Sequence, residues 1–369
     1  MRVEDISLKC FRNYQDCHVR FSPGINVISG ANAQGKTNLL EAVFMLASGR
    51  SFRTRFDREL IGFAHDRAEV VATVYSGGRN QTIALQLARG ARKRITRNGV
   101  RETGTSLSGT LAVVLFCPDD LNLIKEGASS RRRLMDLAIG QLRPGYSNLL
   151  AEYNRLYEHK SRILKDWREK PDLLPVLETF SDQMCRCSAQ MIRYRAAFVK
   201  RLQTAAAAIH QEFSGGKESL TLEYTTVSSV QDPLSSTAVL YEEIRRHQAA
   251  HRTAELESGQ CLTGVHKDDM VIAINGVSAR NFASQGQART AALSLKLAER
   301  EIFLEELGES PVLLLDDVLS ELDSRRQAFI LNRIGGGQTL ITCCEDQQIV
   351  ERTGGHVIFI HDGAVKEEQ

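Results

Sequence analysis

Eight residues near the N-terminus have the types and spacing of a phosphate-binding loop. Gly30-Ala31-Asn32-Ala33-Gln34-Gly35-Lys36-Thr37 fits the pattern G-x-x-x-x-G-K-[ST]. In such a loop, main-chain N–H groups surround a β-phosphate and the N-terminus of the next helix adds partial positive charge. The lysine reaches β and γ oxygens, and the threonine hydroxyl ligates Mg²⁺. A buried strand is expected at 25–29 and an apolar helix from Asn38 to about Ala47, which is the context that this chemistry requires.

A second group with chemical potential is a pair of carboxylates after an aliphatic run. Val312–Leu315 is followed directly by Asp316 and Asp317. A buried strand that ends in acids places them at the carboxyl edge of a sheet, where ligand sites of α/β proteins lie. Asp316 would hold Mg²⁺, directly or through water, and Asp317 would orient or deprotonate an attacking water. The alternative is a solvated strand end.

Two further segments look like helix starts with polar caps. Ser284-Gln285-Gly286-Gln287 precedes a long helical pattern, with Ser284 as N-cap and Gly286 permitting close backbone approach. It is either an anion site at a helix N-terminus or an ordinary cap. Ser320-Glu321-Leu322-Asp323 reads as a second N-cap with an acidic first turn.

The elements that must position these residues alternate between sheet and helix. Strand patterns dominate the first part, ending with the apolar run Leu111–Phe116. Two long amphipathic helical patterns follow, at 146–167 and 177–213, separated by Pro171, and predict a helical hairpin. Strand patterns return from about Leu262. We therefore expect an α/β protein with a discontinuous lobe, 1–115 and 262–369, and an inserted, largely helical lobe, 116–261.

Charge is distributed unevenly along the 369 residues, although the formal net charge is only +2. Between Arg89 and Arg101 there are six basic residues (89, 92, 93, 94, 97, 101) and no acid. Between Glu301 and Asp323 there are eight acids (301, 305, 306, 309, 316, 317, 321, 323) and no base. Because regional charge sets the local field, the small sum does not exclude a nucleic-acid partner.

Composition excludes several classes of protein. With 42% hydrophobic and 25% charged residues the chain is neither disordered nor collagen-like. It has no apolar run of about 18 residues, so no membrane span is expected, and its first residues lack the apolar region of a secretory signal. Its eight cysteines form no C-x₂-C pair. Free thiols in a reducing, cytoplasmic setting are expected.

The order of these motifs resembles that of ABC-type ATPases. A phosphate loop, a small polar signature, an aliphatic-Asp-Asp strand and S-x-L-D follow one another, with Asn32 and Asn38 in the loop as in the SMC branch. The chain is more closely similar to the bacterial RecF family of DNA replication and repair proteins. The similarity rests on GRSFRT at 49–54, F-x-P-x-D-L at 116–121, RRRLMD at 131–136, GVHKDD at 264–269 and SQGQARTAALSLKLAE at 284–299. Ala33, Val265 and Lys267 stand where that family usually has Gly, Pro and Arg.

The resemblance implies a P-loop ABC-type ATPase head with an inserted helical lobe, acting as a head-to-tail dimer in the presence of ATP and Mg²⁺. Lys36, Asp316, Asp317 and Ser284 would be the catalytic residues. The nucleotide contacts would be residues 30–38 (Gly30, Ala31, Asn32, Ala33, Gln34, Gly35, Lys36, Thr37, Asn38) together with Gly286, Gln287 and Asp323. Ser284 and Gly286 of one chain would cap the γ-phosphate bound by Lys36 of the other, and Thr37 and Asp316 would hold Mg²⁺.

The family's partners are double-stranded and gapped DNA, and RecR with RecO, in a pathway that places RecA on single-stranded gaps. The resemblance therefore implies a weak, DNA-dependent ATPase that acts as a switch. Candidate contacts to the DNA backbone are Arg92, Lys93, Arg94, Arg131, Arg132 and Arg133, and the alternative for them is a solvated face. The sequence offers no recognition helix, so binding is expected to be sequence-independent.

Two other classes of ATPase are disfavoured. A transporter subunit would have LSGGQ, a shorter interval between loop and signature, and a histidine after the strand at 338–342, where this chain has Cys343, Cys344 and Glu345. An ATPase partner of a DNA-end nuclease would need a much longer heptad arm and a C-x₂-C hook.

Overall fold

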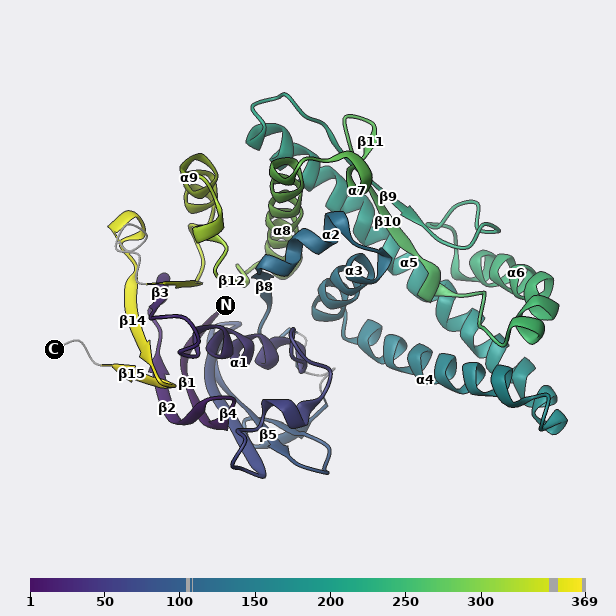
Figure 1. The fold of residues 1–369 in the computed structure, drawn as a ribbon, viewed down its shortest axis with the longest axis horizontal. Helices are drawn as coiled ribbons and strands as arrows, with labels where there is room; N and C mark the ends of the chain where they lie inside the picture. The colour runs from purple at the N-terminus through teal and green to yellow at the C-terminus, as the bar shows by residue number, and fades with distance from the viewer. Residues whose placement is uncertain (104–106, 108, 345–350, 367–369) are drawn as a thin grey trace. The chain divides into compact units, whose positions relative to one another are not determined.

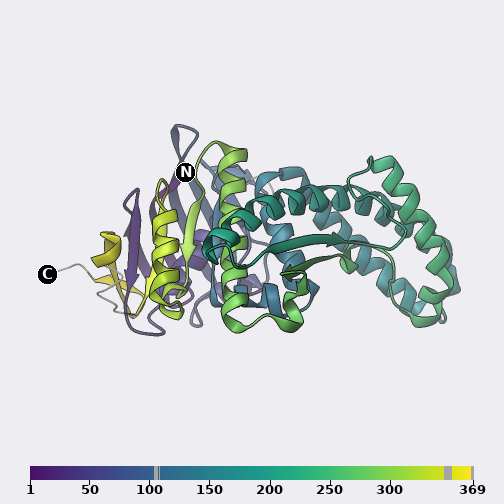
Figure 2. The same ribbon diagram turned by 90° about the horizontal axis from the view of Figure 1, so that it is seen from above.

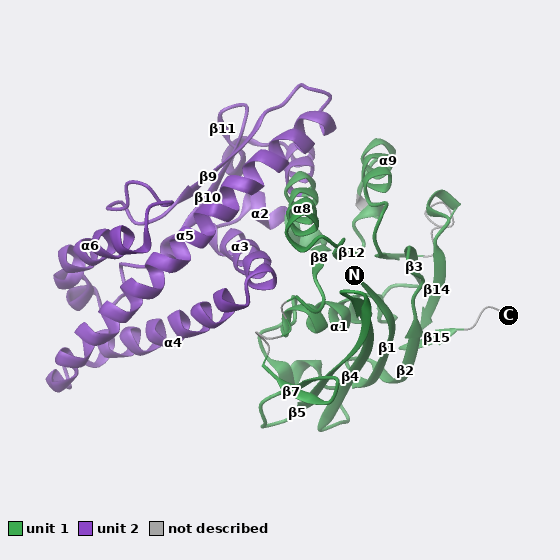
Figure 3. Cartoon of the chain, turned by 180° about the vertical axis from the view of Figure 1, so that it is seen from behind, with its two compact units in different colours: residues 1–120, 293–369 green, residues 121–292 purple. Residues whose placement is uncertain are grey.

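The computed structural model describes residues 1–369 except 104–106, 108, 345–350 and 367–369. It divides into two compact units: unit 1 comprises residues 1–120 and 293–369, and unit 2 comprises residues 121–292 (Figure 3). The first division lies at 120/121, five residues after the predicted boundary at 115/116. The second prediction, 261/262, is wrong, because the strand Asp269–Ile274 pairs with Leu220–Thr225 inside unit 2.

Unit 1 contains two six-stranded sheets. The first is antiparallel with the order β2-β1-β4-β5-β6-β7, and the second has the order β15-β14-β3-β13-β12-β8, parallel apart from β15. The strands of the first are β1 (Arg2–Phe11), β2 (Tyr14–Arg20), β4 (Arg67–Ser76), β5 (Arg79–Ala88), β6 (Arg94–Arg97) and β7 (Val100–Glu102). Those of the second are β3 (Ile25–Ser29), β8 (Val113–Phe116), β12 (Val312–Leu315), β13 (Thr339–Cys343), β14 (His356–His361) and β15 (Ala364–Lys366).

The core of unit 1 lies on both sides of helix α1 (Lys36–Ser48), which contacts strands of each sheet (Figure 1). Alternate residues of β4 are buried, which is the pattern of a sheet with one face in water. Strands β8 and β12 are buried at every position. Their continuous aliphatic runs reflect a parallel sheet that is covered on both faces. Helix α9 (Ser324–Arg333) and the C-terminal half of α8 (Gln285–Leu307) complete the unit. Short 3-10 turns lie at Asp57–Leu60, Pro118–Leu121 and Leu319–Glu321.

Unit 2 is built on the predicted helical hairpin. Helix α4 (Pro144–Asp166) and the forty-residue helix α5 (Leu174–Phe213) flank a 3-10 turn at Pro171–Leu173. Helix α5 packs along α4, α6 and strand β9 (Figure 2). The remaining helices are α2 (Asn122–Lys125), α3 (Ala128–Leu142), α6 (Thr237–Ser258), α7 (Ala279–Phe282) and the start of α8. A three-stranded antiparallel sheet has the order β11-β10-β9, from β9 (Leu220–Thr225), β10 (Asp269–Ile274) and β11 (Val277–Ser278), and a 3-10 turn covers Val265–Lys267.

A buried polar network holds α5 to the GVHKDD segment. The Arg195 guanidinium pairs with Asp136 and Asp268, both at 2.8 Å. Asp268 is fully buried and also accepts hydrogen bonds from the Tyr224 and Thr226 hydroxyls. Asp268 is therefore a buried structural residue that joins α5 to this segment.

The neighbouring His266 ring is also part of the interior. It contacts the Cys261 carbonyl through Nε2 and the Tyr153 hydroxyl through Nδ1. Burial lowers the pKa of His266 to about 4, so the ring is neutral at pH 7. The bond to the carbonyl places the ring proton on Nε2, which makes the Tyr153 hydroxyl the donor to Nδ1.

Two expectations drawn from composition concern the chain as a whole. None of the described helices is long and apolar enough to span a membrane. All eight cysteines lie in the described ranges and are unpaired. Five of the eight (Cys10, Cys17, Cys117, Cys343, Cys344) lie in unit 1 strands or directly after them, and Cys344 is the exposed one.

Candidate nucleotide-binding site

The phosphate loop connects β3 to α1, as the sequence predicts. Gly30 has φ 154, and a Cβ there would meet the Ile360 carbonyl oxygen at 2.3 Å, so only glycine fits. Gly35 has φ 117, and a Cβ would lie 2.8 Å from the Asn13 amide. Ala33 takes a left-handed φ of 65, a conformation that glycine adopts more easily.

Residues from the turn between β1 and β2 hold the loop from outside. The Tyr14 hydroxyl donates to the Gly35 carbonyl (2.9 Å) and the Asn13 amide donates to the Gln34 carbonyl (2.9 Å). The Asn38 amide donates to Asn13 Oδ1 and its oxygen accepts from Arg53, each at 2.8 Å. Asn38, predicted as a nucleotide contact, therefore already has partners that link the loop to the 49–54 segment.

The Lys36 ammonium lies inside the loop. It donates to the carbonyls of Gly30 (2.7 Å) and Ala31 (2.9 Å) and contacts Cys344 Sγ at 3.6 Å. Helix α1 has no acidic residue in its first turn and no side-chain cap at its N-terminus. Its first N–H groups and the lysine thus present positive charge to the same small volume, which suits a polyphosphate.

The carboxylate pair lies beside the loop because β12 and β3 flank the same strand, β13. Asp316 is buried and accepts a hydrogen bond from the Thr37 hydroxyl at 2.9 Å. It also accepts one from the Thr342 hydroxyl at 3.0 Å. Burial raises the pKa of Asp316, and these two hydrogen bonds offset part of that rise. The contact between Thr37 and Asp316 brings the phosphate loop and the acidic strand end together.

Asp317 adopts a left-handed backbone with φ 53, which is uncommon for a residue other than glycine. Its N–H donates to Thr342 Oγ1 at 2.8 Å. Its Oδ1 is buried and has no hydrogen-bond partner within the described part of the chain. Backbone strain together with an unpaired buried oxygen is typical of a functional site.

The donor set fits Mg²⁺. The Thr37 hydroxyl and the Asp316 carboxylate are hard oxygen ligands, already 2.9 Å apart, and Mg²⁺ prefers such ligands beside substrate phosphates. The unpaired Oδ1 of Asp317 is available to a ligand or to water at the same strand ends. Thr37 and Asp316 are the metal ligands that the sequence predicts, and Asp317 is predicted to act on water.

Strand β13 supplies two residues that the sequence analysis did not assign. Thr342 connects the loop side to the acidic side through its bonds to Asp316 and Asp317. The exposed Cys344 thiol donates to Asn32 Oδ1 at 2.8 Å. The sequence does show a polar residue, Thr342, near the end of the strand that follows the two acids. Only the strand order, with β13 between β3 and β12, shows that this residue lies between the two motifs. Glu345 lies outside the described residues.

The signature segment belongs to unit 2, whereas the loop and the acids belong to unit 1. Ser284 and Gln287 form a reciprocal cap at the start of α8: the Ser284 N–H donates to Gln287 Oε1 (2.9 Å), and the Gln287 N–H donates to Ser284 Oγ (3.2 Å). The Gln287 amide also donates to Glu218 at 2.9 Å. The predicted N-cap is confirmed, and Ser284 is exposed. The nucleotide contacts of Ser284, Gly286 and Gln287 stay predictions.

Asp323 is the N-cap of α9. Its carboxylate accepts from the Arg326 N–H at 3.0 Å and pairs with the Arg326 guanidinium. The predicted N-cap, Ser320, is wrong: its hydroxyl donates to the Asp317 carbonyl, and the helix begins at Ser324 with no acid in its first turn, capped by Asp323. The carboxylate is exposed, and its assigned role at a dimer interface stays a prediction.

The basic candidates for DNA contact divide into two groups. Arg92 and Arg94 are exposed, and the turn Asn98-Gly99 joins β6 to β7 with positive φ at both residues. Lys93 pairs with Asp57 at 3.1 Å.

Arg131 is wrong as a DNA contact. Its guanidinium is buried and binds both carboxylate oxygens of Asp269, and Nη1 donates to the carbonyls of Leu123 and Glu126. Arg132 donates to the Asp268 carbonyl, and Arg133 is exposed.

Comparison with known proteins agrees with this geometry. The family model described as "RecF/RecN/SMC N terminal domain" matches residues 2–363. The DNA replication and repair protein RecF of Acetivibrio thermocellus is 39% identical over 98% of this chain and 98% of its own length. RecF of Listeria welshimeri is 39% identical over 99% of this chain and all of its own. The chain belongs to the RecF family.

Among the similar solved structures is one of a RecF protein with ATP. A RecF structure described as the recombination mediator with ATP in the RecFOR pathway has a TM-score of 0.92 at 34% identity, over 100% of this chain and 97% of the other. An SMC head bound to a domain of ScpA has a TM-score of 0.56 at 17% identity, which shows a shared fold. This RecF-family chain therefore has the ATP-binding SMC/ABC-type ATPase fold that its motifs indicate.

Proposed function

We propose that this protein is an ATP-dependent clamp on double-stranded and gapped DNA that acts in recombinational repair and replication-fork maintenance. The observation that supports it best is the contact between Thr37 and Asp316 beside Lys36, which joins the phosphate loop to the acidic strand end. ATP phosphates would take the place of the Gly30 and Ala31 carbonyls as partners of the Lys36 ammonium. Mg²⁺ held by Thr37 and Asp316 would neutralise charge on the β and γ phosphates.

Hydrolysis would depend on Asp317. Its backbone is strained and its Oδ1 is buried without a hydrogen-bond partner among the described residues, so this oxygen can orient a water or accept its proton. The resemblance to the RecF family suggests a slow ATPase that acts as a switch. The family relation and the ATP-bound relatives support this reading.

The signature would act on a second copy of the chain. Ser284 and Gly286 lie at the start of a long helix whose N-terminus favours anions. In a head-to-tail pair with C2 symmetry, each signature would complete the site formed by Lys36 of the other chain. ATP then holds the pair together, and hydrolysis or release separates it. RecR and RecO would be partners in placing RecA on single-stranded gaps.

The test is sedimentation combined with duplex binding, each measured with and without ATP and Mg²⁺. The expected result is a monomer without nucleotide, a dimer with ATP, and tighter binding to duplex or gapped DNA in the dimer. A monomer under both conditions would contradict the composite site. A dimer that binds no duplex would contradict the DNA function.

A further inference from the structure

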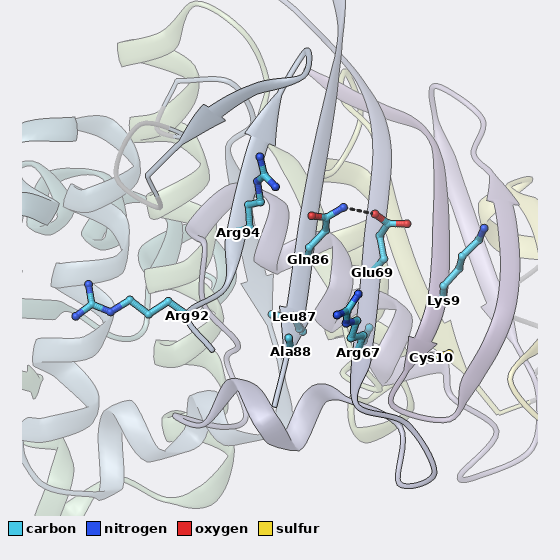
Figure 4. A pocket seen from close by; sticks show the side chains of 10 residues that line it. Lys9, Cys10, Arg67, Glu69, Gln86, Leu87, Ala88, Arg92 and Arg94 are labelled. Atoms are coloured by element: carbon cyan, nitrogen blue, oxygen red, sulfur yellow. Dashed lines mark hydrogen bonds between the residues drawn. The ribbon is translucent and has the colours of Figure 1, made fainter. Parts of the chain in front are cut away.

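The water-facing side of the antiparallel sheet carries a basic groove that the ATPase chemistry does not use. The groove has a volume of about 440 Å³ and is lined by residues of β1, β4 and β5 and by the segment leading into β6 (Figure 4). We define it by four cations: Lys9, Arg67, Arg92 and Arg94. All four are exposed, and none of them has an ion pair to a carboxylate within the described ranges.

Strand register explains why these cations lie together. Lys9 pairs with Glu69, Glu69 with Gln86, and Gln86 with Arg94, so one row crosses four strands. Glu69 is the one carboxylate among the residues that line the groove. The Gln86 amide donates a hydrogen bond to it at 2.8 Å (Figure 4). Adjacent strands are about 4.8 Å apart, so the row from Lys9 to Arg94 spans about 15 Å.

Arg67 widens the row on the same face. It lies two residues before Glu69 on β4 and pairs with Ala88 on β5, whose small side chain leaves the surface open. Three of the four cations thus come from different strands, β1, β4 and β6, and Arg92 lies just before β6. The opposite face of these strands is the core of unit 1, so the groove needs no second unit or second chain to form.

We infer that this basic groove binds the phosphate backbone of duplex DNA, with Lys9 and Arg67 as contacts beside Arg92 and Arg94. The inference deepens the proposed function and rests on it. A span of about 15 Å slightly exceeds the ~12 Å width of the major groove of B-DNA, so Lys9 and Arg94 can reach phosphates on both strands. Cations spread along an open row suit a polyanion with regularly spaced charges. A small anion would instead need cations that converge on one point.

A protein partner fits the groove less well. Leu87 and Ala88 are its apolar lining besides Ala68, and none of the lining residues is aromatic. Stable protein interfaces rely on aromatic or large apolar anchors at a desolvated centre. Backbone binding needs only charge, and it reads no sequence.

The experiment compares the full chain with Lys9→Ala/Arg67→Ala in duplex binding at a series of salt concentrations, in ATP and Mg²⁺. Each lost phosphate contact lowers the slope of log K against log salt by about 0.9. The double variant should bind more weakly, with a slope lower by about 2. Between about 50 mM and about 200 mM salt the parent should therefore lose about tenfold more affinity than the variant.

Two single variants sharpen the result. Arg79→Ala removes one exposed cation at the other end of β5 and should leave the slope unchanged. Glu69→Gln removes the carboxylate of the groove and should strengthen binding. As a control, ATP binding is measured for each variant, and retained ATP binding shows that unit 1 is intact. If the parent binds duplex DNA and the double variant keeps the same affinity and salt slope, the inference about the groove is wrong. It is also wrong if the double variant loses only its binding to an acidic polypeptide. A parent that binds no duplex would instead contradict the proposed function.

Discussion

Replacing Arg131 tests whether this arginine is structural, as its burial indicates, or contacts DNA, as its place in RRRLMD suggested. In Arg131→Met the aliphatic stem stays and the charge is lost. The guanidinium contacts Asp269 through Nε at 2.6 Å and Nη2 at 2.8 Å, and its side chain is 5% exposed. Removing one partner of a buried ion pair costs 3–5 kcal/mol; because Asp269 is 26% exposed and can be rehydrated, we expect about 3 kcal/mol.

The measurement is urea unfolding followed by tryptophan fluorescence. The chain has a single tryptophan, Trp167, in unit 2, where its indole donates to the Leu256 carbonyl. Its signal therefore reports the unit that contains Arg131. With an m-value of about 2 kcal/mol per M, the midpoint should fall by about 1.5 M. Arg133→Met, on the exposed face of the same helix, is the matched control and should change stability by less than about 0.5 kcal/mol.

The effect should also depend on pH in a definite direction. Burial alone would raise the pKa of Asp269, but the hydrogen bonds and charge of Arg131 outweigh it and hold the pKa below its usual range. Because the folded pKa is lowered, the pair's contribution is complete above the unfolded pKa of about 3.9 and is lost as the pH falls through the folded value. The difference between parent and Arg131→Met should therefore narrow below about pH 4. An unchanged midpoint at pH 7, together with a smaller salt slope in DNA binding, would refute the structural role.

Four other substitutions or modifications probe the nucleotide site. Lys36→Ala should abolish ATP binding, measured by fluorescent-nucleotide titration; retained affinity would contradict the phosphate loop. Asp317→Asn should keep ATP binding and lose phosphate release, since only the proton acceptor changes. Alkylation of the exposed Cys344 with N-ethylmaleimide should lower ATP affinity at least about tenfold, because Sγ lies 3.6 Å from the Lys36 ammonium. Bound ATP should protect Cys344 from alkylation, and the ATP affinity of Cys344→Ala should not change on treatment. Ser284→Arg should block ATP-driven dimerisation in sedimentation while the monomer still binds ATP, and a normal dimer would contradict the composite site.

Local motifs were predicted well because their conformation depends on few distant residues. The loop from Gly30 to Thr37 takes its conformation mainly from its own glycines and from the strand and helix on either side, and Asn13 and Tyr14 add two hydrogen bonds from outside. The caps at Ser284 and Asp323 are local hydrogen bonds, within three residues of their partners.

The errors concern features that depend on pairing between distant segments. The strand Asp269–Ile274 has the same alternating pattern whichever sheet it joins, so the sequence could not show that its partner is β9. Arg131 and Arg133 lie in the same basic run of the sequence, yet Arg131 faces β10 and Arg133 faces water. Thr342 became a site residue only because β13 lies between β3 and β12.

The same reasoning explains why a net charge of +2 was uninformative about DNA. Of the acids between 301 and 323, Asp316 and Asp317 lie at the nucleotide site and Asp323 caps a helix, so none of these three opposes the basic groove. Of the basic stretch, Lys93 is neutralised by Asp57, and Arg97 by Glu102 at 2.7 Å. Arg89 pairs with Asp66 at 3.7 Å. Arg92, Arg94 and Arg101 have no carboxylate partner among the described residues, and the first two line the groove. The register adds Lys9 and Arg67 from strands whose sequences show no basic cluster. A binding surface for a polyanion is therefore set by which cations lack a carboxylate partner on one face of a sheet, a property that strand pairing determines and a charge count along the chain cannot.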